Sequence, residues 1–128
     1  MLVVALVAAS LAAVVHVYIF VLESLRWNEP ATRRVFGTTE ETARMTAPLA
    51  YNQGFYNLFL AVGVAAGVPL VALDSDAGAP LLVFGCGSMA AAALVLVLSD
   101  RSRARAAVVQ GAVPAVALLA LLVDSIAS

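Results

Sequence analysis

The sequence predicts an all-α integral membrane protein, an antiparallel bundle of four transmembrane helices. Of its 128 residues, 63% are hydrophobic and 12% are charged, and the mean hydropathy is +1.01. A soluble chain this short could not bury so much apolar surface, and soluble domains are about one quarter charged. The apolar residues also gather in four runs, each long enough to cross about 30 Å of hydrocarbon. A water-soluble enzyme, a disordered chain and a nucleic-acid binder are therefore excluded.

The four predicted spans occupy most of the chain. The first covers about residues 2–25. No basic residue precedes Arg26 and the apolar run is longer than that of a signal peptide, so we expect this span to be retained. The other spans cover about residues 47–73, 80–98 and 105–123. Residues 1–128 then form a single membrane domain, and the short connections make successive helices antiparallel neighbours.

The first connection, residues 28–46, is polar. Its Thr38-Thr39-Glu40-Glu41 string is typical of a helix start, with a threonine cap and acids in the first turn. We expect a short amphipathic helix there, at the membrane surface. In the third connection, Asp100 is placed to cap the fourth helix.

The orientation follows from the basic residues. There are seven, and the sequence holds no lysine. They lie in the first and third connections only: Arg26, Arg33, Arg34, Arg44, Arg101, Arg103 and Arg105. Cytoplasmic loops carry the excess of arginine and lysine. We therefore expect these two connections in the cytoplasm, both termini and the second connection outside, and a multi-pass protein of the cell inner (plasma) membrane.

Small residues indicate close helix packing. Membrane helices associate by van der Waals contact, which small side chains allow. Gly63 and Gly67 form a GxxxG pair in the second span, and Gly85 and Gly87 supply a thin face in the third. The single cysteine, Cys86, is interpreted as a small apolar residue of a packed helix.

Polar residues inside the spans are the candidate functional residues, because ionisable groups at membrane depth usually face the bundle interior or a cavity. His16, Phe20, Glu23 and Trp27 are spaced 4, 3 and 4 and share one helix face. In the second and fourth spans the candidates are Asn52, Gln53, Tyr56, Asn57 and Gln110, the last preceding Pro114. All fall in the half of the bundle that we expect to be cytoplasmic.

Each candidate also has a purely structural interpretation. Glu23 could pair with Arg26 one turn on, and His16 could hydrogen-bond a carbonyl and do nothing more. Trp27 is also typical of an interfacial aromatic belt. The amides could join helices, each contributing about 0.6 kcal/mol.

Three strings resemble a known family: residues 16–27, residues 52–61 with Asn-Gln-Gly-Phe-Tyr-Asn, and residues 110–115. They are similar to the signature of domain-of-unknown-function family 1304, small four-span bacterial membrane proteins, some of which carry the label "epimerase". The resemblance covers nearly the whole chain. It implies four spans and a shared polar set: His16, Glu23, Asn52, Gln53, Asn57 and Gln110. It implies no established substrate or reaction.

Three hypotheses about function remain. In the favoured one, a polar pocket binds a small or amphipathic molecule through Trp27, Asn52, Gln53, Tyr56, Asn57 and Gln110. His16 and Glu23, about 10 Å apart along the axis, would then serve isomerase-like acid–base chemistry. The alternatives are a small transporter or proton-coupled exchanger acting as an oligomer, and a structural or accessory subunit. We expect no cofactor or metal, and as partners membrane lipid, a hydrophobic or amphipathic ligand or a second copy of the chain, not nucleic acid.

Overall fold

The computed structural model describes residues 1–127 and contains four long helices in that range. α1 (Leu2–Phe20) continues into a π-helical turn, η1 (Val21–Leu25). α3 (Glu40–Ala72), α4 (Gly78–Ser99) and α5 (Ala104–Ala127) follow, with the short helix α2 (Pro30–Phe36) before α3 and a 3₁₀ turn, η2 (Arg101–Arg103), before α5. No strand occurs in the described chain. Four helices are long and apolar enough to cross a membrane, which confirms the predicted fold class.

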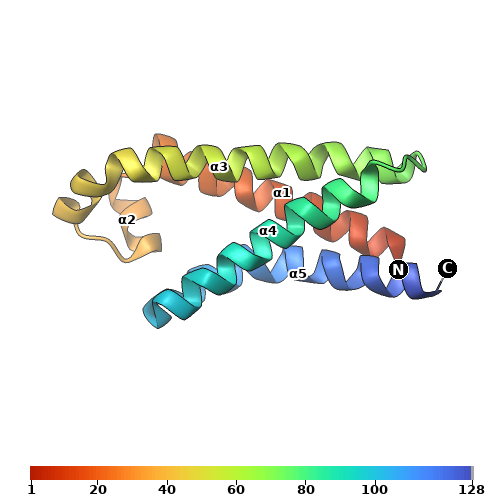
Figure 1. Cartoon of the computed structure of the whole chain (residues 1–128). Helices are drawn as coiled ribbons and strands as arrows, with labels where there is room; N and C mark the ends of the chain where they lie inside the picture. The colour runs from red at the N-terminus through yellow and green to blue at the C-terminus, as the bar shows by residue number, and fades with distance from the viewer. Residues whose placement is uncertain (128) are drawn as a thin grey trace.

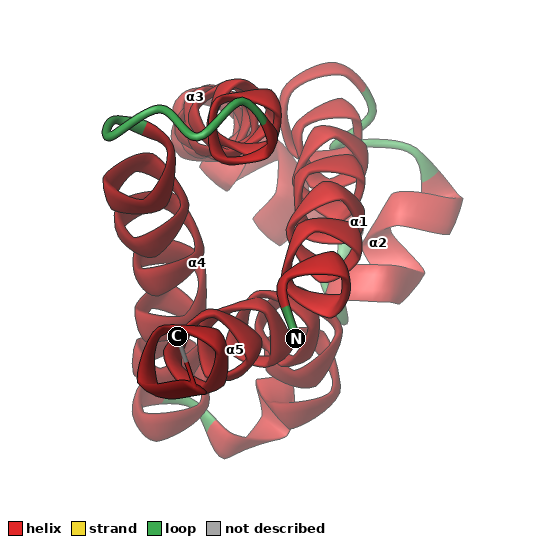
Figure 2. Ribbon diagram, turned by 90° about the vertical axis from the view of Figure 1, so that its right-hand side faces the viewer, coloured by secondary structure: helices red, strands yellow, loops and turns green. Residues whose placement is uncertain are grey.

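The long helices pack as a ring in which each packs mainly against two others. α1 lies between α3 and α5, and α4 lies between the same two helices on the far side (Figure 2). Both termini and the α3–α4 connection lie at one end of the bundle, and the other two connections lie at the opposite end (Figure 1). We refer to this second end as the arginine-rich end, because its two connections hold most of the arginines, with Arg44 and Arg105 in the adjoining turns of α3 and α5.

Close approach between helices relies on particular small residues. A Cβ at Gly67 would lie 2.8 Å from Leu82 of α4, and one at Gly85 would meet Val64 of α3. A Cβ at Gly63, by contrast, would find nothing within 4 Å. Of the GxxxG pair, therefore, Gly67 brings two helices together and Gly63 does not.

The first connection differs in part from its prediction. The Thr39 cap is confirmed, because its hydroxyl accepts a hydrogen bond from the Thr42 backbone N–H at 3.2 Å. The helix that it starts is α3 itself, which runs on to Ala72 without a break. The short helix comes earlier, at Pro30–Phe36, with proline in its first turn and Gly37 ending it at φ 63°. This proline-first, glycine-last pattern is typical of a helix and could have predicted α2.

Asp100 stabilises the third connection. Its carboxylate accepts hydrogen bonds from the hydroxyl and the backbone N–H of Ser102, at 2.6 and 3.0 Å. These bonds, with that from Arg103, hold the pKa of Asp100 below its usual value. Asp100 thus caps the 3₁₀ turn that leads into α5, slightly earlier than the predicted cap of the helix.

Candidate functional site

A π-helical turn carries Glu23 at the end of the first membrane helix. The Arg26 backbone N–H donates to the Val21 carbonyl at 3.0 Å, a bond that spans five residues instead of four. Such turns are rare and are often found at functional sites. The extra residue rotates the following side chains away from the positions that regular helical spacing gives them.

Asn57 of α3 contacts the Glu23 carboxylate. Its Nδ2 donates to Glu23 Oε2 at 2.8 Å and also lies 3.3 Å from the Gln53 carbonyl. Asn57 is 5% exposed and Glu23 is half-buried. A buried carboxylate without a donor is costly, so Asn57 stabilises Glu23 in its position. Among the described residues, the hydrogen bond to the carboxylate of Glu23 is accepted by Oε2 and none is accepted by Oε1.

The contact between η1 and α3 depends on Gly54. The Ser24 hydroxyl donates to the Tyr51 carbonyl at 2.7 Å. A Cβ at Gly54 would collide with that hydroxyl and lie 3.0 Å from the Ser24 nitrogen. Glycine therefore allows the two backbones to approach closely enough for Glu23 to reach Asn57.

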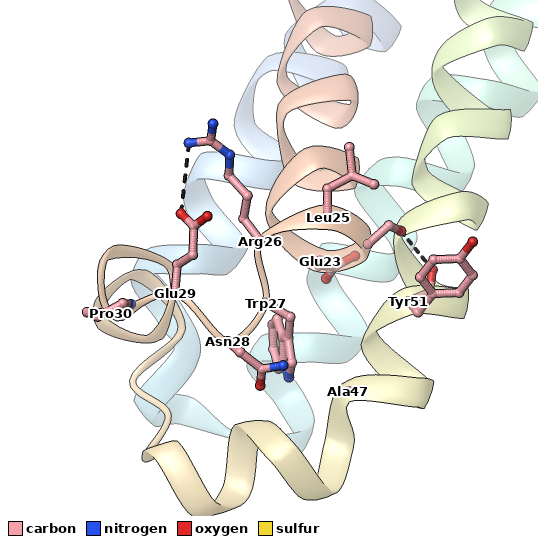
Figure 3. A pocket seen from close by; sticks show the side chains of 10 residues that line it. Glu23, Leu25, Arg26, Trp27, Asn28, Glu29, Pro30, Ala47 and Tyr51 are labelled. Atoms are coloured by element: carbon pink, nitrogen blue, oxygen red, sulfur yellow. Dashed lines mark hydrogen bonds and ion pairs between the residues drawn. The ribbon is translucent and has the colours of Figure 1, made fainter.

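A pocket of about 450 Å³ opens beside this contact, at the arginine-rich end (Figure 3). Its lining comes from η1, the turn that follows, α3 and the first residue of α2. The charged members are Glu23, Arg26 and Glu29, and the aromatic members are Trp27 and Tyr51. Figure 3 shows Arg26 directed toward Glu29 and away from Tyr51, and the two charges lie 3.9 Å apart. Arg26 is thus paired with Glu29 and not with Glu23, the partner considered from sequence.

Trp27 forms a fixed wall of the pocket. Its Nε1 donates to the Ala43 carbonyl at 3.1 Å and to the Thr46 hydroxyl at 3.2 Å. Its ring lies 5.0 Å from that of Phe36 in α2. The indole therefore ties the turn after η1 to both α2 and the start of α3.

The comparison with protein families now identifies the chain. The model of a family described as "Protein of unknown function (DUF1304)" matches residues 10–122. The chain belongs to this family. No curated protein and no solved structure matches it. The matched part of the DUF1304 chain includes every residue that lines the pocket.

His16 of this DUF1304 chain lies outside the pocket. It is fully buried, and its Nδ1 lies 2.9 Å from the Ala12 carbonyl oxygen in the preceding turn. Its Nε2 is buried without a hydrogen-bond partner among residues 1–127. The structure therefore does not bring the imidazole and the Glu23 carboxylate to one cavity.

The remaining amide candidates and Tyr56 are dispersed. Asn52, Gln53 and Tyr56 are exposed on α3, whereas Gln110 of α5 is half-buried and has no side-chain hydrogen bond within the described residues. The face that α3 buries is instead formed mostly by small residues: Ala43, Ala50, Gly54, Asn57, Ala61, Val64 and Gly67. Small side chains face inward because the helices pack closely, and Asn57 is the polar member of that face.

Sequence reasoning missed several residues of the pocket. Ser24, Arg26, Glu29 and Ala47 line it but were not among the candidates. Ser24 and Gly54 carried a usable signal, since a small residue on each of two adjacent helices is typical of a close contact.

Proposed function

We propose that this protein is a multi-pass protein of the plasma membrane that binds a small or amphipathic molecule in the pocket beside Glu23. The arginine-rich end would face the cytoplasm, as the distribution of arginines predicts. The observation that carries the proposal is a half-buried carboxylate that has one protein donor, Asn57, and lines a pocket of about 450 Å³. Ligand sites typically combine such a cavity with few, well-placed polar groups.

The position of the pocket fits an amphipathic ligand. Its polar side chains lie near the end of the first membrane helix, where the chain leaves the predicted span. Leu25 lines the same pocket and is 63% exposed. A ligand could therefore place a polar group at Glu23 while its apolar part extends past Leu25 toward lipid.

Binding is better supported than acid–base catalysis. A reaction using two proton-transfer groups needs both within hydrogen-bond reach of the substrate. Glu23 lines the pocket, whereas His16 is enclosed by the helix core. We therefore assign Glu23 to ligand recognition and give His16 no role in the pocket.

Filling the pocket tests the proposal. Ala47 lines it from α3, so Ala47→Phe would occupy its volume. Ala92→Phe, on an exposed position of α4, is the matched control. All three proteins would be purified in mild detergent, and the co-purifying small molecules and lipids extracted and compared by mass spectrometry. We expect at least one compound enriched with wild type and Ala92→Phe but lost from Ala47→Phe; identical profiles would overturn the proposal.

A further inference from the structure

The pocket carries an excess of negative charge on its lining. Three formally charged side chains contribute to it: Glu23, Arg26 and Glu29. Arg26 is already paired with Glu29 at 3.9 Å. Glu23 has only the neutral amide of Asn57 as a partner. A ligand with a positive charge would therefore supply the counter-charge that the protein does not.

Two aromatic rings lie on the same lining. Trp27 comes from the turn after η1 and Tyr51 from α3, and Figure 3 shows the Tyr51 ring directed away from Trp27. Trp27 is held in place by its two hydrogen bonds, whereas Tyr51 is 54% exposed and packs 5.1 Å from the Phe55 ring. Tryptophan and tyrosine faces attract cations, and quaternary ammonium groups are the ligands that such aromatic sites typically recognise.

We propose that the pocket selects amphipathic molecules whose head group is a substituted ammonium, held by the Glu23 carboxylate beside Trp27 and Tyr51. This inference rests on the proposed function and names its ligand class. The shared chemistry is an ammonium on an apolar tail, and two sources could supply it: the head group of a membrane lipid or a free amphipathic amine. An anionic head group would instead meet Glu23 with like charge.

The fluorescence of Trp27 can report ligand binding to the pocket. Trp27 is the only tryptophan, and it lines the pocket. Its fluorescence would be followed in the full-length protein in dodecyl maltoside, an uncharged detergent. The probes would be hexyltrimethylammonium, hexyl sulfate and hexanol, which share one tail and differ in head-group charge. We expect hexyltrimethylammonium to give a saturable change with an affinity at least about tenfold higher than the other two.

Variants identify the group responsible. Glu23→Gln should weaken hexyltrimethylammonium binding at least about tenfold, because it removes the charge but keeps the shape. Glu41→Gln is the matched control, since Glu41 is exposed at the start of α3 and outside the pocket; it should bind like wild type. Near-ultraviolet circular dichroism of each variant would confirm that the packing of the aromatic side chains is unchanged.

The possible outcomes separate the two proposals. Equal binding of hexanol and hexyltrimethylammonium, or unchanged cation binding by Glu23→Gln, would overturn ammonium selectivity and leave the pocket as a binding site. If no probe saturates, the ammonium proposal is overturned, and the mass-spectrometric comparison of Ala47→Phe with Ala92→Phe decides the proposed function separately. Adding phosphatidylcholine, whose head group ends in a trimethylammonium, or phosphatidylglycerol, which is anionic, to the micelles then tests the source. Competition by the former alone assigns the ammonium group to a lipid, and a lack of competition by both assigns it to a free amine.

Discussion

The hydrogen bond from Asn57 to Glu23 joins two helices at a depth where polar groups are costly. Asn57→Leu keeps the side-chain volume but leaves Glu23 Oε2 without its donor. We expect this variant to lower the free energy of unfolding by about 1–3 kcal/mol, the usual cost of a buried polar group that loses its partner. The measurement is reversible unfolding in mixed sodium dodecyl sulfate and dodecyl maltoside micelles.

Introducing Asn57→Leu into a chain that already lacks Glu23 shows whether the loss of stability comes from the Asn57–Glu23 hydrogen bond. In a Glu23→Met chain no carboxylate remains, so Asn57→Leu should cost clearly less there than in wild type. An equal loss in the two backgrounds would mean that Asn57 stabilises the bundle independently of Glu23.

Replacing His16 with leucine should not destabilise the protein, in contrast to replacing Asn57. Because the Ala12 carbonyl only accepts, Nδ1 must donate to it, and Nε2 then carries a lone pair that meets no donor in the described chain. An unpaired buried acceptor costs about 1–3 kcal/mol. His16→Leu should therefore leave the unfolding free energy unchanged or raise it.

His16→Ala is the comparison for that variant. It also removes the unpaired nitrogen but leaves a cavity in a fully buried position, so it should be less stable than His16→Leu. A loss for the leucine variant as large as that for the alanine variant would show that the imidazole makes a polar interaction essential to the fold.

At the scale of elements, the contact between η1 and α3 decides whether the pocket forms. Gly54→Ala would place a methyl group against Ser24, with the Ser24 backbone nitrogen only 3.0 Å away. We expect a loss of about 1–3 kcal/mol in unfolding free energy, as for other over-packed sites. Gly63→Ala, on the same helix but with nothing within 4 Å of the new methyl group, should be neutral or slightly stabilising because alanine favours helix. Equal effects of the two would contradict the close approach of Gly54 to Ser24.

The length of α3 explains how Trp27, which lines the pocket, is held in position. Its 33 residues extend for about 50 Å, whereas the hydrocarbon core is about 30 Å thick. Because its first turn carries Glu40 and Glu41, we expect the start of α3 to lie beyond the hydrocarbon, where Ala43 and Thr46 accept from Trp27. A helix only as long as the hydrocarbon is thick would lack these first turns, and Trp27 would then lose both of its hydrogen-bond acceptors.

For the whole molecule, the testable expectation is orientation. Both termini and the α3–α4 connection lie at one end and the arginine-rich connections at the other (Figure 1). Ala31→Cys in α2 and Ala77→Cys before α4 would place exposed thiols at opposite ends. The native Cys86 is buried and would be replaced by alanine in both chains.

A membrane-impermeant maleimide then reads the orientation in intact cells. We expect Ala77→Cys to be labelled directly and Ala31→Cys only after permeabilisation. The reverse pattern would place the arginine-rich end, and the pocket with it, outside the cell.

The candidate site was predictable from sequence only in part. Glu23, Asn57 and Trp27 stand out as polar or amphipathic side chains within or beside apolar runs, and the structure brings the first two into contact. Asn52, Gln53 and Tyr56 stand out equally but are exposed. The 100° periodicity that groups residues on one face does not say which face packs inward. On α3 the face that packs inward is the one that carries the small residues Ala50, Gly54 and Ala61.

The amino-acid sequence by itself determined the helices and their antiparallel order, because an apolar run of membrane length must satisfy its backbone internally and helices do so. Only the tertiary structure decided the π-helical turn at Glu23, the pairing of Arg26 with Glu29 and the enclosure of His16. These depend on how far each helix rotates and how closely it approaches its neighbour. Packing of small residues such as Gly54 against Ser24 sets that rotation and distance, and hydropathy contains no information about either.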